Sequence, residues 1–174
     1  MLKLAMFSID EKDYLSKIPA SKKAKIFPFN ENTLKIAEEI ILSINKIYPD
    51  LKVKHMGASA LRISGQKDID IYAFSDPKDF HKYIPGLIKF FGKPKNIHKS
   101  FCEWKFKKKG FDIEFYLTDK HSKTMKKQIN VYEILKKDKR LLKKYEKLKE
   151  SLDGKSFKKY QEKKYRFYSD ILNK

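Results

Sequence analysis

The stretch from residue 51 to residue 74 constrains the fold and the chemistry of this chain more than any other. Its pattern predicts a strand over residues 51–56, a tight turn at Gly57, a short helix or loop, and a second strand that opens with Asp-Ile-Asp. Alternate residues of a strand point to the same face of a sheet. The carboxylates of Asp68 and Asp70 are therefore expected side by side, with the isoleucine between them turned toward a core.

These paired carboxylates, together with the preceding turn, predict a site for a divalent cation and a phosphate. Two carboxylates held this close repel each other unless a cation lies between them. Magnesium prefers oxygen ligands, and two Mg²⁺ ions order phosphates for in-line displacement. Gly57 lets the backbone approach an anion, and Ser59 offers a hydroxyl and an N–H group. We therefore expect two Mg²⁺ ions, with Mn²⁺ as a substitute. The alternative is a solvated strand edge, where Asp-x-Asp is common.

The rest of the chain predicts helices around a small sheet. Apolar residues recur at helical spacing over residues 34–47 and 80–91, and the region 119–174 reads as helical throughout. A β-hairpin is expected over residues 101–117, because alternating segments flank a lysine-rich turn. The fold class expected is α+β, a single domain over residues 1–174 with a small mixed sheet flanked by helices and a helical C-terminal segment from residue 119.

The first thirty residues are less informative. The segment Leu4 to Ile9 has the pattern of a short edge strand, and Asn30 is a candidate N-cap for the helix that follows it.

Composition narrows the partners and the compartment. The 174 residues carry a formal net charge of +19, which attracts polyanions such as RNA, DNA or nucleotides. Nucleic acid such as tRNA is thus an expected partner, although biased codon usage also enriches lysine. A single cysteine, Cys102, allows no internal disulfide and agrees with a reducing cytoplasm. No run is long enough to span a bilayer, and no membrane partner is expected. The oligomeric state stays open.

The order of strand, Gly-x-Ser turn, spacer and Asp-x-Asp resembles the nucleotidyltransferase superfamily of the DNA polymerase β type. The resemblance implies that an NTP lies over Gly57, Ala58 and Ser59, and that Asp68 and Asp70 hold Mg²⁺. Such enzymes carry a third carboxylate on a neighbouring strand, which completes the metal site and accepts a proton from the attacking hydroxyl. Its counterpart here is Asp112, with Glu114 as the substitute. The alternative is that both acids balance lysine neighbours.

A second resemblance covers residues 28–172 and is to the GrpB-like family of this superfamily. The segment His55-Met56-Gly57-Ala58-Ser59 is similar to the family's His-hydrophobic-Gly-Ser-Thr motif. The later family motifs are matched in order by Val131-Tyr132-Glu133-Ile134-Leu135, by Tyr145 with Leu148-Lys149, and by Tyr160, Lys164 and Phe167. This chain departs from the pattern at Ala58 and in having both Asp68 and Asp70 where many members keep one acid. The family implies a fold without supplying a reaction.

The function expected is transfer of a nucleoside monophosphate from an NTP to an undefined acceptor, which is RNA, protein or a small molecule. Three basic residues are candidates for binding the nucleotide by location or by family match: Arg62, Lys67 and Lys164. The first alternative is a non-catalytic nucleotide- or nucleic-acid-binding module on the same fold. The second is a protein-modifying transferase, and a phosphohydrolase ranks last.

Overall fold

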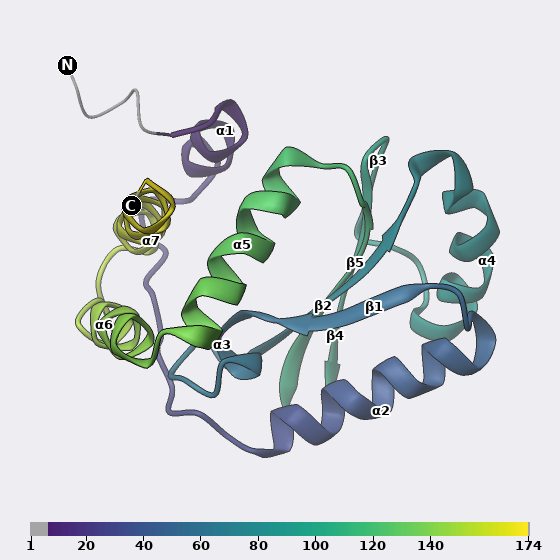
Figure 1. Ribbon diagram of the computed structural model, residues 1–174, viewed down its shortest axis with the longest axis horizontal. Coiled ribbons are helices and arrows are strands. Elements are labelled where there is room, and N and C mark those ends of the chain that lie inside the picture. The colour runs from purple at the N-terminus through teal and green to yellow at the C-terminus, as the bar shows by residue number, and fades with distance from the viewer. Residues whose placement is uncertain (1–6, 174) are drawn as a thin grey trace.

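A five-stranded mixed sheet in the order β1-β2-β5-β4-β3 forms the centre of the computed structural model, which describes residues 7–173 (Figure 1). The strands are β1 (Lys52–Met56), β2 (Asp68–Ser75), β3 (Asn96–His98), β4 (Phe101–Lys108) and β5 (Phe111–Asp119). Strands β2 and β5 pair in parallel, and the other three pairs are antiparallel. The parallel pair brings the beginning of β5 beside the beginning of β2.

One face of the sheet is apolar and packs against two helices, α2 (Asn32–Ile47) and α4 (Phe80–Phe91). Helix α2 buries Ile36, Ile40 and Ile44, which recur every four residues and so form one stripe. The sheet contributes the alternate residues Ile69, Ile71, Ala73, Cys102, Trp104, Ile113, Phe115 and Leu117 to the same core. Since neighbouring residues of a strand point to opposite faces, the polar residues of β2, β4 and β5 lie on the other face.

The C-terminal part of the chain forms three helices, α5 (Lys123–Lys137), α6 (Lys139–Glu150) and α7 (Phe157–Leu172). The side chains of Ser122, Asp138 and Ser156 accept hydrogen bonds from backbone N–H groups at the three N-termini. These caps explain why a lysine-rich region divides into helices at these points. Helix α5 lies on the side of the sheet opposite α2 (Figure 1).

A second apolar cluster joins these helices to the turn after β1. It combines Val131, Leu135, Tyr145 and Phe167 with Ala58 of the short helix α3 (Gly57–Ala60). The cluster therefore holds α6 and α7 beside the turn that precedes β2.

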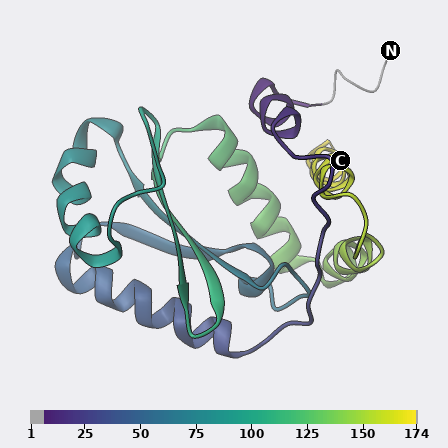
Figure 2. The same cartoon turned by 180° about the vertical axis from the view of Figure 1, so that it is seen from behind.

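The N-terminal segment runs along α6 and α7 after the first helix, α1 (Ile9–Ser16) (Figure 2). Lys23 forms an isolated β-bridge with Ser156 at the start of α7, and Phe27 forms another with Gly65 in the loop before β2. Through these two bridges, the segment contacts both the helical C-terminal part and the sheet.

The structure confirms the expected α+β class, the mixed sheet, the flanking helices and the helical C-terminal segment. The predicted strand over Leu4 to Ile9 is wrong at its end, because Ile9 begins α1. Ser8 and Glu11 form a reciprocal capping box there, which favours a helix. Residues 4–6 lie outside the described residues. The N-cap of α2 is Glu31, and the Asn30 side chain instead accepts from the Asn32 N–H at 2.9 Å.

Helices long and apolar enough to cross a membrane are absent from the described part of the chain.

Candidate functional site

The two aspartates predicted from the sequence lie on the polar face of β2, next to the acids of β5. The parallel register places Asp68 opposite Asp112 and Asp70 opposite Glu114. The stacking of Tyr72 on the neighbouring strand's tyrosine, with ring centroids 5.1 Å apart, continues this register along the same face. Four carboxylates therefore begin two adjacent strands on one side of the sheet.

Gly57 allows the Asp70 carboxylate to lie directly against the turn before α3. Its φ of +78° is in the left-handed region, which glycine adopts without steric cost. A Cβ at this position would overlap the Asp70 Oδ2 and lie 3.2 Å from the Asp70 Cγ. Both the backbone conformation and the free space thus depend on glycine at position 57.

The environment disfavours the charged form of both aspartates. Burial raises the pKa of Asp70 well above its usual range, and the charges of Asp68 and Glu114 raise it further. Burial also raises the pKa of Asp68, with Glu114 as the next contributor. Neither side chain forms an ion pair with any residue in the range 7–173. The described part of the protein therefore gives the two carboxylates no close counter-ion that would stabilise their charged forms.

The two candidates for the third carboxylate differ in their surroundings. Asp112 is 58% exposed at its side chain and pairs with Lys107 at 2.6 Å. Glu114 binds Lys105 at 2.7 Å, accepts a hydrogen bond from the Tyr116 hydroxyl at 2.9 Å, and acts electrostatically on Asp68 and Asp70. No three His, Cys, Asp or Glu side chains between residues 7 and 173 are grouped as a complete metal site. The strand register sets one of these acids opposite each aspartate, and the charge of Glu114 is the one that raises the pKa of both Asp68 and Asp70.

Two lysines from the C-terminal helices, one buried and one half-buried, face the aspartate pair. Lys149 of α6 is 5% exposed, and Lys164 of α7 is half-buried. Both positive charges lower the pKa of Asp68 and of Asp70, yet neither ammonium group is paired with a carboxylate of the described residues. The arrangement sets two cations opposite two anions without direct contact between them.

The protonation states of the two lysines differ. Burial lowers the pKa of Lys149 to about 8, and repulsion from Lys164 contributes to the shift. Burial lowers the pKa of Lys164 as well, but the surrounding tyrosines outweigh it, and its pKa lies well above the usual value. These tyrosines are Tyr145, Tyr160, Tyr165 and Tyr168. Lys164 is therefore charged at neutral pH, and Lys149 loses its proton in the weakly alkaline range.

Lys149 was not predicted as a site residue. It lies four residues after Tyr145 and three before Leu152, so it falls on the apolar stripe of its helix. A lysine among the apolar positions of a helix is expected to be buried, and this position in the sequence is the signal that could have identified Lys149.

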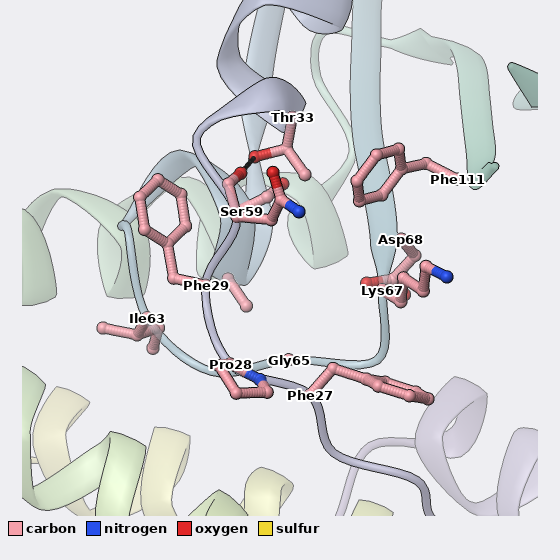
Figure 3. Close-up of a pocket in the computed structure, with 12 residues that line it drawn as sticks. Phe27, Pro28, Phe29, Thr33, Ser59, Ile63, Gly65, Lys67, Asp68 and Phe111 are labelled. Atoms are coloured by element: carbon pink, nitrogen blue, oxygen red, sulfur yellow. Dashed lines mark hydrogen bonds between the residues drawn. The ribbon is translucent and has the colours of Figure 1, made fainter. Parts of the chain in front are cut away.

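A cavity of about 310 Å³ opens beside Asp68 (Figure 3). Figure 3 shows Phe29 and Phe111 on opposite sides of this space, with Ser59 between them at the upper edge. Its lining comprises Phe27, Pro28, Phe29, Asn30, Thr33, Ala58, Ser59, Ile63, Gly65, Lys67, Asp68 and Phe111. Most of this surface is apolar, and Figure 3 shows its polar side chains in two places, with Thr33 and Ser59 at the upper edge and Lys67 and Asp68 at the side. Such a combination is typical of small-molecule sites.

The predicted nucleotide-binding residues fall into three groups. Ala58, Ser59 and Lys67 line the cavity, whereas Arg62 is exposed and does not contribute to its wall. Gly57 lies against the Asp70 carboxylate, and Lys164 acts on both aspartates through its charge, but neither residue lines the cavity. Lys67 has a φ of +65°, an uncommon conformation for a residue other than glycine, immediately before the first aspartate.

His55 is an additional polar residue at the site. Its Nε2 lies 2.8 Å from the Ser59 Oγ, and burial lowers the pKa of His55 to about 4. The imidazole is therefore neutral near pH 7 and orients the hydroxyl that lines the cavity.

The buried imidazole predicts acid sensitivity. In the unfolded chain, His55 binds a proton below about pH 6.5, whereas in the folded protein it binds one only near pH 4. Stability should therefore fall as the pH drops between these values, by about 3 kcal/mol in total relative to His55→Gln. Urea unfolding of both proteins from pH 7.5 to 4 measures this difference. A constant difference across that range would contradict the prediction.

Comparisons with known proteins agree with the resemblance noted in the sequence. The model of the GrpB protein family matches residues 23–174, while curated proteins yield no match. A crystal structure of conserved protein GrpB from Enterococcus faecalis has a TM-score of 0.66 and 11% identity, covering 86% of this chain and 99% of that chain.

More distant similarity extends to two other solved structures. The Cid1 poly(U) polymerase bound to MgGTP has a TM-score of 0.45 and 14% identity, over 76% of this chain and 43% of that chain. The GLD-2/RNP-8 complex has a TM-score of 0.45 and 16% identity, over 84% of this chain and 62% of that chain. Because the family model spans nearly the whole sequence, the chain belongs to the GrpB protein family.

Proposed function

We propose that this protein is a Mg²⁺-dependent nucleotidyltransferase, which moves a nucleoside monophosphate from an NTP to an acceptor and releases pyrophosphate. One observation carries the proposal. The half-buried aspartate pair, Asp68 and Asp70, faces the buried Lys149 and the half-buried Lys164 beside a cavity of about 310 Å³. Within residues 7–173, none of these four side chains forms an ion pair. A metal-bound polyphosphate would complement both pairs at once, because it brings positive charge to the aspartates and negative charge to the lysines.

The donor set fits Mg²⁺. This ion is usually held in proteins by one or two carboxylates together with water and substrate phosphates. Asp68 and Asp70 would supply the carboxylates, so a complete protein cage is not required. When bound, the metal would neutralise phosphate charge and order the phosphates for displacement. Mn²⁺ has the same ligand preference and would substitute for it.

The surrounding residues would bind and orient the nucleotide. Phe29 and Phe111 would hold a base between their rings, and Ser59, oriented by His55, would donate to a phosphate or sugar oxygen. Lys149 and Lys164 would stabilise the charge that develops on the leaving phosphates. A carboxylate of β5 would accept the proton of the attacking hydroxyl. Glu114 is a stronger candidate than Asp112, because its charge raises the pKa of both Asp68 and Asp70.

The test is calorimetric titration of a non-hydrolysable NTP with and without Mg²⁺. Binding is expected only with the metal, and the affinity should fall as the pH rises through about 8, where Lys149 loses its proton. Lys149→Met should weaken binding about tenfold or more and remove this alkaline dependence. The variant should fold, because methionine fills the same space without a buried charge.

Two results would oppose the proposal. Wild-type protein that shows a native circular dichroism spectrum but binds no NTP with Mg²⁺ or Mn²⁺ would rule it out. Equal binding with and without metal would favour the second candidate, a non-catalytic nucleotide-binding module. Glu114 and Asp112 form ion pairs with Lys105 and Lys107, which supports that candidate. Of the four carboxylates that begin β2 and β5, the two aspartates of β2 are then the ones left for a metal.

A further inference from the structure

A second, larger hollow adjoins the nucleotide-sized cavity. Its volume is about 590 Å³, and it lies between the N-terminal segment, the loop before β2, strands β4 and β5, and the start of α7. Phe27, Lys67 and Asp68 line both hollows. This lysine-lined groove therefore leads to the aspartate that we assign to metal binding.

The charge of the groove is strongly positive and largely uncompensated. Six lysines line it: Lys22, Lys23, Lys25, Lys67, Lys105 and Lys107. Lys105 and Lys107 pair with the acids of β5. The other four form no ion pair with any carboxylate in the described range 7–173. Four unpaired cations along one groove favour a ligand with several anionic groups.

The backbone that carries three of these lysines is held rigidly. The Phe157 N–H donates to the Lys22 carbonyl at 2.8 Å, and the Ala24 N–H donates to the Lys155 carbonyl at 2.9 Å. The Ile26 N–H donates to the Asp153 carboxylate at 2.8 Å. Hence the lysine side chains project from a fixed backbone, and a ligand need not order the segment.

Aromatic rings accompany the lysines. Phe27 is 40% exposed, and its backbone is fixed by hydrogen bonds to Gly65 at 2.7 and 3.0 Å. Phe106 also lines the groove, and the Lys22 ammonium group lies 3.9 Å from the centre of the Phe157 ring. Phe157 is buried and Phe106 half-buried, so Phe27 is the exposed ring of the three. An exposed aromatic ring among lysines is a feature that binds single-stranded nucleic acids, because a base stacks on the ring while the phosphates bind the cations.

We propose that this groove binds single-stranded nucleic acid, and that the bound strand presents its end to Asp68 as the acceptor. The assignment of an acceptor rests on the proposed nucleotidyltransferase function, whereas the binding of the strand does not. A duplex would match the groove less well, since its bases are stacked inside and cannot reach Phe27. A polyphosphate would use the lysines but not the aromatic rings.

Binding of a fluorescent twelve-nucleotide RNA, followed by anisotropy over a series of KCl concentrations, tests the groove. The variant Lys22→Gln with Lys23→Gln and Lys25→Gln should lose about tenfold or more in affinity and should bind with a salt slope smaller by about 2. The matched control is Lys89→Gln with Lys93→Gln and Lys95→Gln, at and beyond the end of α4. These lysines are exposed, and α4 lies at the end of the sheet away from α6 and α7 (Figure 1).

The control should retain wild-type affinity within about twofold, although it loses the same charge. Equal weakening by both triple variants would mean that net charge alone attracts RNA, and would overturn the proposal.

Phe27→Ala separates stacking from charge. It should reduce the affinity for the single strand by about fivefold or more with an unchanged salt slope. Inorganic polyphosphate binding should be insensitive to this change. If Phe27→Ala had no effect on RNA, or if a duplex of the same length bound as tightly as the single strand, the groove would be a site for polyanions in general and the proposal would fail.

Nucleotide titration of the same proteins distinguishes this inference from the proposed function. The groove triple variant should bind NTP with Mg²⁺ like the wild type, because Lys22, Lys23 and Lys25 do not line the first cavity. RNA binding without any NTP binding would support the groove and reject the transferase. NTP binding without groove-dependent RNA binding would reject the groove alone.

Discussion

Replacement of Asp70 by asparagine is expected to stabilise the protein while it abolishes Mg²⁺-dependent nucleotide binding. The folded state raises the pKa of Asp70, first by burial and then by the charges of Asp68 and Glu114. A group with a raised pKa favours folding when it is neutral, and this contribution is lost as the pH rises through that pKa. Asparagine keeps the neutral shape at every pH. We expect a gain of about 1–2 kcal/mol at pH 7.

Thermal unfolding of the metal-free wild type and Asp70→Asn measures the gain, which should shrink as the pH is lowered toward 4. Asp112→Asn is the matched control, because its carboxylate is exposed and paired with Lys107. That control should change stability by no more than about 0.5 kcal/mol. A loss of stability in metal-free Asp70→Asn would contradict this prediction. It would mean that the Asp70 carboxylate stabilises the fold, whereas we expect it to lower the stability of the metal-free protein.

Gly57→Ala should have the largest destabilising effect of the substitutions considered, about 3 kcal/mol. Two causes combine. Alanine is strained at a φ of +78°, and its Cβ would overlap the Asp70 carboxylate. Since the carboxylate must move, nucleotide binding with Mg²⁺ should also be lost.

A matched glycine separates the two causes. Gly110 has a similar φ of +82°, but a Cβ there would meet no atom within 4 Å. Gly110→Ala should therefore cost only the backbone strain, about 1 kcal/mol. Urea unfolding of both variants, and of Gly57→Ala combined with Asp70→Ala, gives the coupling between the two positions. Equal losses at the two glycines would show that the carboxylate does not occupy the space beside Gly57.

The central part of this site follows from sequence patterns that are local. The alternation of polar and apolar residues in β2 predicts that Asp68 and Asp70 share a face. Gly57, the turn residue between β1 and β2, predicts that the backbone comes close to a ligand or side chain. Both depend on neighbours in the chain, as do the helix caps at Ser122, Asp138 and Ser156. The hydrophobic periodicity also predicts which face of each helix is buried.

The remaining features depend on contacts between distant segments. The parallel pairing of β2 with β5 decides that Glu114 lies opposite Asp70, and no local pattern encodes that pairing. Likewise, Lys105 engages Glu114 only because β4 returns beside β5 in a fixed register. The burial of Lys149 among many exposed lysines follows from the packing of α6 against α7 and from the approach of its ammonium group to the loop at Gly65.

The two β-bridges of the N-terminal segment have a consequence for the free energy of ligand binding. The carboxylates belong to the sheet, whereas Lys149 and Lys164 belong to helices about 80 and 95 residues later in the chain. The segment is bridged to Ser156 at one end and to Gly65 at the other, so it acts as a short tether between these two halves. A tether raises the effective concentration of one half near the other. The halves are thus preorganised, and a ligand spends little of its binding free energy on bringing them together.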